Sequence, residues 1–250
     1  MRHVGKRISF DCAAQIYDKT RGPPERVMDK LVKSLITELR SYGTILDAGV
    51  GTGRFAKPLQ DNGFELVGAD ISTRMLRKAV ERGVDSLFRS DVCFLPFKAD
   101  SFDATVCVHL LHLVSEWKMA LWEICRVTQK ALVTTIYANK NPIQEAYSSL
   151  LKDYGYASRK LGKGEWELRD LVKPSRSVFV ASYEISADER LSHLGQRAHS
   201  SQWEVPENVN KRVVNELKGI FERKTMPQEL HVLSWRIDDL KAYCTRELMS

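Results

Sequence analysis

Three glycines alternate with other residues in the turn Gly49, Gly51 and Gly53, and Asp47 stands two positions before the first of them. Glycine lacks the Cβ that blocks a close approach, and it accepts the positive φ angles of a tight turn. Asp70 closes a second apolar segment, nineteen residues after Gly51. Glycines for the turn and a carboxylate for ribose hydroxyls form the nucleoside-binding half of a Rossmann-like unit.

The charge beside this turn favours one kind of nucleoside. Dinucleotide sites usually read G-x-G-x-x-G and place a pyrophosphate on the following helix. Here the spacing is G-x-G-x-G, and the Asp47 carboxylate at its mouth would repel a pyrophosphate. It suits a ligand that carries positive charge, such as the amino group and sulfonium of S-adenosylmethionine. We therefore prefer the methyl donor to a dinucleotide, and a glycine-rich turn without a ligand is the third alternative.

Strand and helix patterns alternate around these residues. Apolar residues at helical spacing and short apolar segments predict a parallel sheet with right-handed crossovers. Strands are expected over 44–47, 65–70, 85–89, 102–108 and 130–137, and helices over 25–39, 53–62, 73–82 and 116–127. After Tyr137 the rhythm changes, and two further strands, 177–185 and 230–237, are expected to complete the same sheet. Helices over 143–154, 166–172, 187–196 and 206–223 would cap its C-terminal edge, and a last helix begins at 238.

The composition restricts the class of protein. With 250 residues, 43% of them hydrophobic, the chain suits one α/β domain with a full core. No segment approaches the roughly 18–20 apolar residues of a membrane span, and no apolar signal region follows the basic N-terminus. The five cysteines are scattered without a C-x-x-C pair, which favours reduced thiols in the cytoplasm and no metal site. A net charge of +6 fits a solvated basic surface or an anionic partner such as RNA.

Four segments, in this order, carry a resemblance to a known family: 46–53, 68–72, 90–97 and 101–107. With them the chain resembles the class I S-adenosylmethionine-dependent methyltransferases, in particular the group typified by ubiquinone/menaquinone-biosynthesis methyltransferases, over about residues 17–137. The resemblance implies an α/β, Rossmann-like fold with a mostly parallel seven-stranded sheet, helices on both faces and an α-helical cap. It divides the chain into a cofactor-covering segment and helix (1–42), a donor-binding core (43–138), a helical insertion or cap (139–176) and C-terminal strands (177–250) with a helical insertion at about 187–224.

The resemblance also implies roles for individual residues toward S-adenosylmethionine. Asp47 and the glycine turn would hold its methionine part, Asp70 the ribose hydroxyls, and Asp91 the adenine amino group. The implied donor-binding residues are Tyr17, Arg21, Asp47, Ala48, Gly49, Gly51, Gly53, Asp70, Ile71, Met75, Asp91, Val92, His109 and Leu110. Tyr17 and Arg21 belong to the N-terminal segment that would fold over the donor.

Only some methyl acceptors need a general base in the enzyme. Methyl transfer from a sulfonium is an in-line displacement, so positioning supplies much of the rate, and a base serves only O–H, N⁺–H or C–H acceptors. His109, just past the fourth strand, is our candidate catalytic residue because open α/β folds bind ligands at that edge. We expect His112 to pack in the following turn and His199 to be exposed. Trp203 and Trp166 are candidate walls of an acceptor pocket, although a buried tryptophan more often belongs to a core.

Three functions remain open from the sequence. The helical segments after Tyr137 favour methylation of a small molecule, the basic charge keeps an RNA methyltransferase as the alternative, and a donor-binding regulator without activity is the third. The segment His109-Leu110-Leu111-His112 differs from the Asn/Asp-Pro-Pro-aromatic motif that grips a flipped base amine, and no Pro-Cys nucleophile follows the fourth strand. The sequence carries no signal for an oligomeric state.

Overall fold

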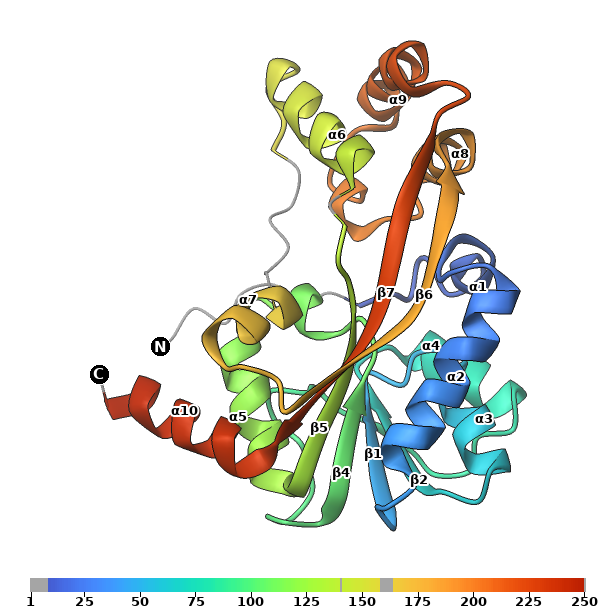
Figure 1. The fold of residues 1–250 in the computed structure, drawn as a ribbon. Coiled ribbons are helices and arrows are strands. Elements are labelled where there is room, and N and C mark those ends of the chain that lie inside the picture. Colours follow the sequence, from blue (N-terminus) through green and yellow to red (C-terminus); the bar gives the residue numbers. More distant parts are fainter. Residues whose placement is uncertain (1–8, 140, 158–163, 250) are drawn as a thin grey trace.

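A seven-stranded sheet forms the centre of the molecule in a computed structural model, which describes residues 9–139, 141–157 and 164–249 (Figure 1). The strand order is β3-β2-β1-β4-β5-β7-β6. The strands are β1 (Thr44–Ala48), β2 (Glu65–Asp70), β3 (Leu87–Arg89), β4 (Phe102–Cys107), β5 (Thr128–Tyr137), β6 (Arg176–Ser186) and β7 (Thr225–Arg236).

The sheet is mixed. Neighbouring strands among β1 to β5 pair in parallel, whereas β7 runs antiparallel to both β5 and β6. The Rossmann-like α/β fold is thus confirmed, and the two late strands complete the same sheet. The central strand β4 is buried along nearly its whole length, as expected of a parallel strand covered on both faces, while β7 alternates between buried and exposed positions over much of its length.

Helices form where the apolar spacing predicts them. Residues 25–39 are helical as predicted, and Ser72 caps the helix after β2 by accepting a hydrogen bond from the Met75 backbone N–H at 3.1 Å. The helix after the glycine turn begins at Ala56 instead of Gly53. The α-helices are α1 (Tyr17–Thr20), α2 (Glu25–Leu39), α3 (Ala56–Asp61), α4 (Thr73–Glu81), α5 (Trp117–Val127), α6 (Pro142–Asp153), α7 (Gly164–Leu171), α8 (Ala187–Gly195), α9 (Glu207–Phe221) and α10 (Ile237–Met249). Two 3₁₀ turns are η1 (Leu111–Leu113) and η2 (Ser200–Gln202).

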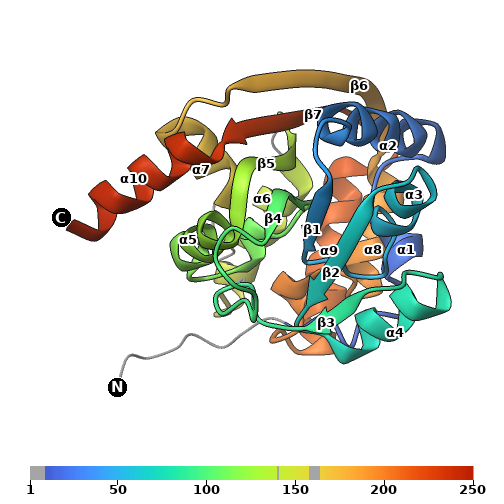
Figure 2. The same cartoon turned by 90° about the horizontal axis from the view of Figure 1, so that it is seen from below.

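Helices cover both faces of the sheet (Figure 2). One face packs on α5, α7 and α10, in a core that includes Leu121, Leu168 and Leu240. The other face packs on α2, α3 and α4, with Leu35 and Leu59 in its core. No helix of the described residues is long and apolar enough to cross a membrane.

Three helices build a separate layer beyond the end of the sheet. Helices α6, α8 and α9 share their own apolar cluster, which includes Tyr147, Leu191 and Val213, and Figure 1 shows them past the carboxyl end of β5. A buried polar contact joins two of these helices, since the Tyr147 hydroxyl donates to Asn210 Oδ1 at 2.6 Å. The helices therefore overhang the edge where the parallel strands end. Parts of the predicted segments 1–42 and 139–176, namely residues 1–8, 140 and 158–163, lie outside the described residues.

Candidate functional site

The glycine turn leaves β1 with three left-handed residues. Gly49, Gly51 and Gly53 have φ angles of +76°, +56° and +73°. A Cβ on Gly49 would lie 2.7 Å from the Leu110 side chain, whereas a Cβ on Gly51 would meet nothing closer than the Gly49 carbonyl oxygen at 3.9 Å. Gly49 thus allows the turn to pack on the segment after β4. Gly51 instead faces open space, where its missing side chain leaves room for a ligand.

Asp70 ties the end of β2 to this turn. Its Oδ2 accepts a hydrogen bond from the Gly51 N–H at 2.9 Å, and its Oδ1 accepts one from the Ser72 N–H at 2.8 Å. Burial raises the pKa of the carboxyl, and these N–H donors partly oppose the rise. Each carboxylate oxygen keeps a second lone pair, so Asp70 can still accept hydrogen bonds from a pair of neighbouring hydroxyls.

A cavity of about 820 Å³ opens above the glycine turn and holds most of the predicted donor-binding residues. Eleven of the fourteen line it, which are Tyr17, Ala48, Gly49, Gly51, Asp70, Ile71, Met75, Asp91, Val92, His109 and Leu110. We call it the donor cavity. The sequence reasoning missed further lining residues, namely Phe10, Ala69, Ser90, Leu95, Val108, Leu113 and Val114. The strand ends and their apolar neighbours bring these residues together.

Three predicted residues lie elsewhere. Gly53 packs under the turn, where a Cβ would come within 2.7 Å of the Val84 side chain. Arg21 lines a second cavity beside the first. Asp47 is buried behind the donor cavity, with 3% of its surface exposed, and burial together with the Asp70 charge raises its pKa to about 7. From the sequence we expected the Asp47 carboxylate at the mouth of the turn, but the structure buries it behind the turn, where it does not form the cavity wall and its raised pKa leaves it partly protonated at pH 7.

Replacement of Asp47 by asparagine is expected to stabilise the ligand-free protein at pH 8. Its folded-state pKa of about 7 lies above the ordinary value of 3.8, so this group lowers stability progressively as the pH rises from about 4 to 7. The gain in the free energy of unfolding should reach a few kcal/mol, on the order of 1.4 kcal/mol per pKa unit, and vanish below pH 4. Urea unfolding at pH 4 and 8 measures it.

A matched asparagine variant should show the opposite sign. Asp103 is held by Lys130 at 2.6 Å and by the Gly43 N–H at 2.8 Å, and these contacts lower its pKa. Asp103→Asn should therefore lose stability at pH 8 where Asp47→Asn gains it. A loss in both variants would show that Asp47 is not electrostatically destabilising.

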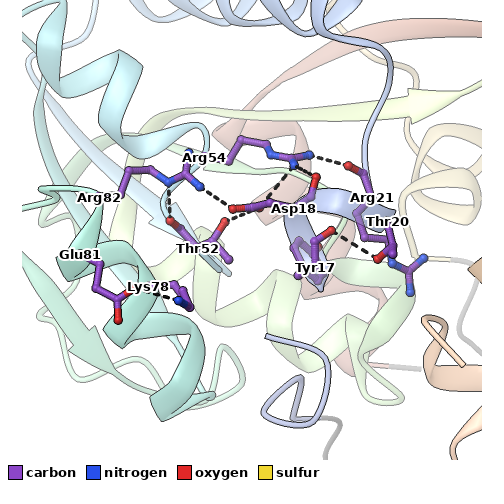
Figure 3. A network of polar contacts seen from close by, with 9 residues as sticks. All are labelled: Tyr17, Asp18, Thr20, Arg21, Thr52, Arg54, Lys78, Glu81 and Arg82. Carbon is purple, nitrogen blue, oxygen red and sulfur yellow. Dashed lines mark hydrogen bonds and ion pairs between the residues drawn. The ribbon is translucent and has the colours of Figure 1, made fainter. Parts of the chain in front are cut away.

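The N-terminal segment is fixed over the turn by a network centred on Asp18 (Figure 3). The Asp18 carboxylate accepts a hydrogen bond from the Thr52 hydroxyl at 2.8 Å and pairs with Arg82 and Arg54. Arg54 also donates to the Arg21 carbonyl oxygen at 2.6 Å. These contacts hold α1 beside the glycine turn, and this position places the Tyr17 side chain in the wall of both cavities.

The second cavity, of about 1620 Å³, adjoins the donor cavity below α6 and α8. We call this second cavity the acceptor cavity. Both cavities are lined by Phe10, Tyr17, His109 and Leu113. The remaining lining residues of the acceptor cavity are mostly polar, and they are Arg21, Gly22, His112, Tyr137, Ala138, Asn139, Asn141, Gln144, Glu145, Trp166, Arg169, Arg190, His199, Ser200 and Gln228. Trp166 lines this cavity, whereas Trp203 lines neither cavity and packs its ring against Phe10, with 5.0 Å between ring centroids.

His109 stands between the two cavities. It has a φ angle of +56°, and its ring stacks on Tyr137 with 5.0 Å between ring centroids. Burial and the neighbouring His112 lower its pKa to about 4, so it is neutral and weakly basic near pH 7. The structure places His109 where the sequence predicted, at the carboxyl edge of the sheet, in an environment that favours shaping the site over accepting a proton.

His112 is anchored by a buried carboxylate that the sequence reasoning missed. Glu165, on α7, is 1% exposed and accepts hydrogen bonds from His112 Nδ1 at 2.9 Å and from three successive backbone N–H groups, those of Leu110, Leu111 and His112. Among the described residues nothing hydrogen-bonds to His112 Nε2, and the ring lines the acceptor cavity. With Nδ1 donating to Glu165, Nε2 carries a lone pair toward the cavity.

His199 differs from its expected exposed position. It is half-buried, and its Nδ1 lies 2.6 Å from a terminal nitrogen of Arg21. The segment that carries it folds back under α8, where Gln202 bonds to Asn210 at 2.9 Å. No group of three His, Cys, Asp or Glu side chains within the described ranges has the arrangement of a metal site.

This fold and site define a Rossmann-like protein with a nucleoside cavity at the carboxyl ends of β1, β2 and β4. Residues 46–131 match the family model described as a methyltransferase domain. The chain is 34% identical over 124 residues to a demethylmenaquinone methyltransferase of Beutenbergia cavernae, which covers 48% of this chain and 52% of the relative. The chain therefore spans about half the length of this curated relative.

Solved structures share the fold. A methyltransferase structure from Thermotoga maritima matches with a TM-score of 0.55 and 19% identity, covering 94% of this chain and 99% of that one. Magnesium protoporphyrin IX methyltransferase from Synechocystis matches with a TM-score of 0.54 and 16% identity, covering 91% and 95% of the two chains. The chain thus contains a region similar to methyltransferase domains, at the place where the motifs predicted one.

Proposed function

We propose that this protein is an enzyme that transfers a methyl group from S-adenosylmethionine to a small molecule. The observation that carries the proposal is the junction of two cavities at His109, one with nucleoside-binding features and one polar. The methyltransferase domain match and the Synechocystis structure, which was solved with bound S-adenosylhomocysteine, support the choice of donor.

The residues of the donor cavity fit an adenosyl sulfonium. Asp70 would accept the ribose hydroxyls, Asp91 would accept from the adenine amino group, and Ile71 would pack on the ring. Gly51 leaves open space beside Asp70, and no arginine or lysine lines this cavity among the described residues. A pyrophosphate would find no cationic side chain there, whereas Asp47 and Asp70 favour positive charge.

S-adenosylmethionine supplies an activated methyl group. The chain must therefore align the two substrates, shield the reacting centre from water and, for a protonated acceptor, remove a proton. Tyr17 and Phe10 would cover the reacting centre, since both line the two cavities and their rings contact each other with centroids 5.7 Å apart. His112 is the group we assign to proton removal, because Glu165 fixes its tautomer and directs Nε2 at the acceptor cavity.

The two cavities support the predicted domain divisions. We infer that residues 9–42 cover the donor, that residues 43–138 form the core that binds it, and that α6, α8 and α9 form a lid whose lower side encloses the acceptor. The five cysteines are free. Free thiols support a reducing compartment, so we place the enzyme in the cytoplasm.

Labelled donor tests the function. Calorimetry should show one S-adenosylmethionine site per chain, and incubation of ³H-methyl donor with a cell extract should label material that passes a 3-kDa filter. Label found only in retained RNA would support the RNA methyltransferase alternative instead. A protein that binds the donor but labels neither fraction would be a donor-binding regulator, and one that binds no donor would refute the proposal as a whole.

A further inference from the structure

The acceptor cavity carries an excess of positive charge. Its described lining includes three arginines, Arg21, Arg169 and Arg190, and one carboxylate, Glu145. His109 and His199 do not add to this charge at neutral pH, because burial lowers the pKa of both. The methyl donor beside this cavity is itself cationic. The excess positive charge of the cavity would therefore favour binding only if the cavity's own ligand were negatively charged.

The three arginines differ in their partners. Arg169 is paired with Asp170, at 2.9 Å. Arg21 donates to the Ala198 carbonyl oxygen and contacts His199, but its buried Nε has no partner and no described carboxylate pairs with it. Arg190, half-buried on α8, forms no hydrogen bond or ion pair with any described residue. Two guanidinium groups therefore face the cavity without a counter-charge.

Unpaired guanidinium charge in a confined site is costly, and an anion offsets the cost. The Arg190 charge lowers the pKa of Arg21, His109 and His199, after the larger effect of burial, which places Arg190 close to the groups around the cavity. The methionine carboxylate of the donor can pair with one arginine. Arg21, on the segment that covers the donor, is the one suited to that carboxylate, and Arg190 on α8 is left for the acceptor.

We propose, on the basis of the function above, that the methyl acceptor is a small anion, a carboxylate or a phosphate, whose charged group binds Arg190. The amide side chains of Asn141 and Gln228 line the same cavity and can add neutral hydrogen bonds. His112 lines it as well, so an anion on Arg190 would place the rest of the molecule between the lid and the shared residues of the donor cavity.

Binding of small probes tests the proposal without turnover. Benzoate, phenyl phosphate and the neutral benzamide, of closely similar size, are titrated by NMR into the protein saturated with S-adenosylhomocysteine. At least one anion should bind about 10- to 100-fold more tightly than benzamide, since charge-assisted hydrogen bonds exceed neutral ones by that margin. Preference for benzoate or for phenyl phosphate identifies the anionic group.

Three variants separate charge from structure. Arg190→Gln should abolish the preference for the anion, Arg190→Lys should retain part of it, and Arg212→Gln, at an exposed position of α9 that lines neither cavity, should leave it within about threefold. Equal binding of benzoate and benzamide by the wild type, or an unchanged preference in Arg190→Gln, would overturn the inference. Failure of the proposed function shows separately, as loss of S-adenosylhomocysteine binding or as absence of labelled small molecules.

Labelled extract gives a second outcome. Methyl-accepting material below 3 kDa should be retained on an anion exchanger at pH 8, and kcat/KM with that fraction should fall about 10- to 100-fold in Arg190→Gln. The affinity for S-adenosylmethionine should change less than threefold, because Arg190 does not line the donor cavity. Methyl-accepting material found only in the unretained fraction would contradict an anionic acceptor.

Discussion

Asp70→Ala is expected to weaken S-adenosylmethionine binding by about 100- to 10,000-fold. Two charge-assisted hydrogen bonds to the ribose hydroxyls contribute roughly 1.5–3 kcal/mol each. The loss extends to the turn, because the Gly51 and Ser72 N–H groups would lose the carboxylate that accepts from them at 2.9 and 2.8 Å. Isothermal titration calorimetry measures the change in affinity.

The matched control is Asp103→Ala. Asp103 also accepts backbone hydrogen bonds at the start of a strand, from Gly43 and Thr44, but it lies at the other end of the sheet from the donor cavity. This variant should lose stability and retain donor affinity. Gly51→Arg should abolish binding by a different route, since its side chain would enter the open space beside Asp70. Unchanged affinity in both Asp70→Ala and Gly51→Arg would place the donor elsewhere.

The donor cavity was predictable because its residues follow strand ends. The carboxyl ends of parallel strands lie at one edge of the sheet, so Asp70 at the end of β2 and Asp91 after β3 lie near the glycine turn after β1. Each position could be found from local sequence, with an apolar segment before it and a turn after it. Asp47 and Gly53 belong to the same motif but face away from the cavity, because side chains alternate along a strand and the turn reverses direction.

The first residues of some helices and strands were less predictable, because backbone geometry and strand pairing determine them more than local amino-acid composition does. Helix α3 begins three residues later than predicted because the left-handed Gly51 and Gly53 cannot form its first turn. Strand β7 begins five residues earlier, at Thr225, since it extends beyond β5 and pairs with β6. Pro227 concealed this extension, because proline usually argues against an internal strand.

The acceptor cavity could not be predicted because distant segments form it. Arg21 and His199 lie side by side although 178 positions separate them, and Glu165 bonds to the loop of His112 from 53 positions away. No periodic pattern or local motif in the sequence indicates either of these two contacts. Only the fold shows that α7 packs so closely on this loop that a Cβ on Gly164 would come within 2.2 Å of the His112 nitrogen.

His112→Gln is expected to lower kcat about 100- to 1,000-fold, with the affinity for S-adenosylmethionine nearly unchanged. Loss of a positioned general base typically costs 100- to 10,000-fold, and glutamine keeps a donor near Glu165 while removing the basic nitrogen. His112 lines the acceptor cavity and not the donor cavity, so donor binding is preserved. Single-turnover methyl transfer at saturating donor measures the effect.

Glu165→Gln tests whether the carboxylate and the histidine act together. Burial would raise the pKa of Glu165, but its interaction with His112 outweighs burial and lowers it, so the ionised form contributes stability near neutral pH that is lost as the pH falls through the folded pKa. The variant should therefore be less stable at pH 7 by roughly 2–4 kcal/mol and show little deficit in acid.

A double-mutant cycle then separates orientation of the base from support of the loop. If Glu165 acts through His112, the double variant transfers methyl groups no more slowly than His112→Gln alone at a temperature where both are folded. Fully additive losses would show that the carboxylate only supports the backbone of Leu110 and Leu111. Glu167→Gln, two residues further along α7, controls for the change of charge and should leave both rate and stability near the wild type.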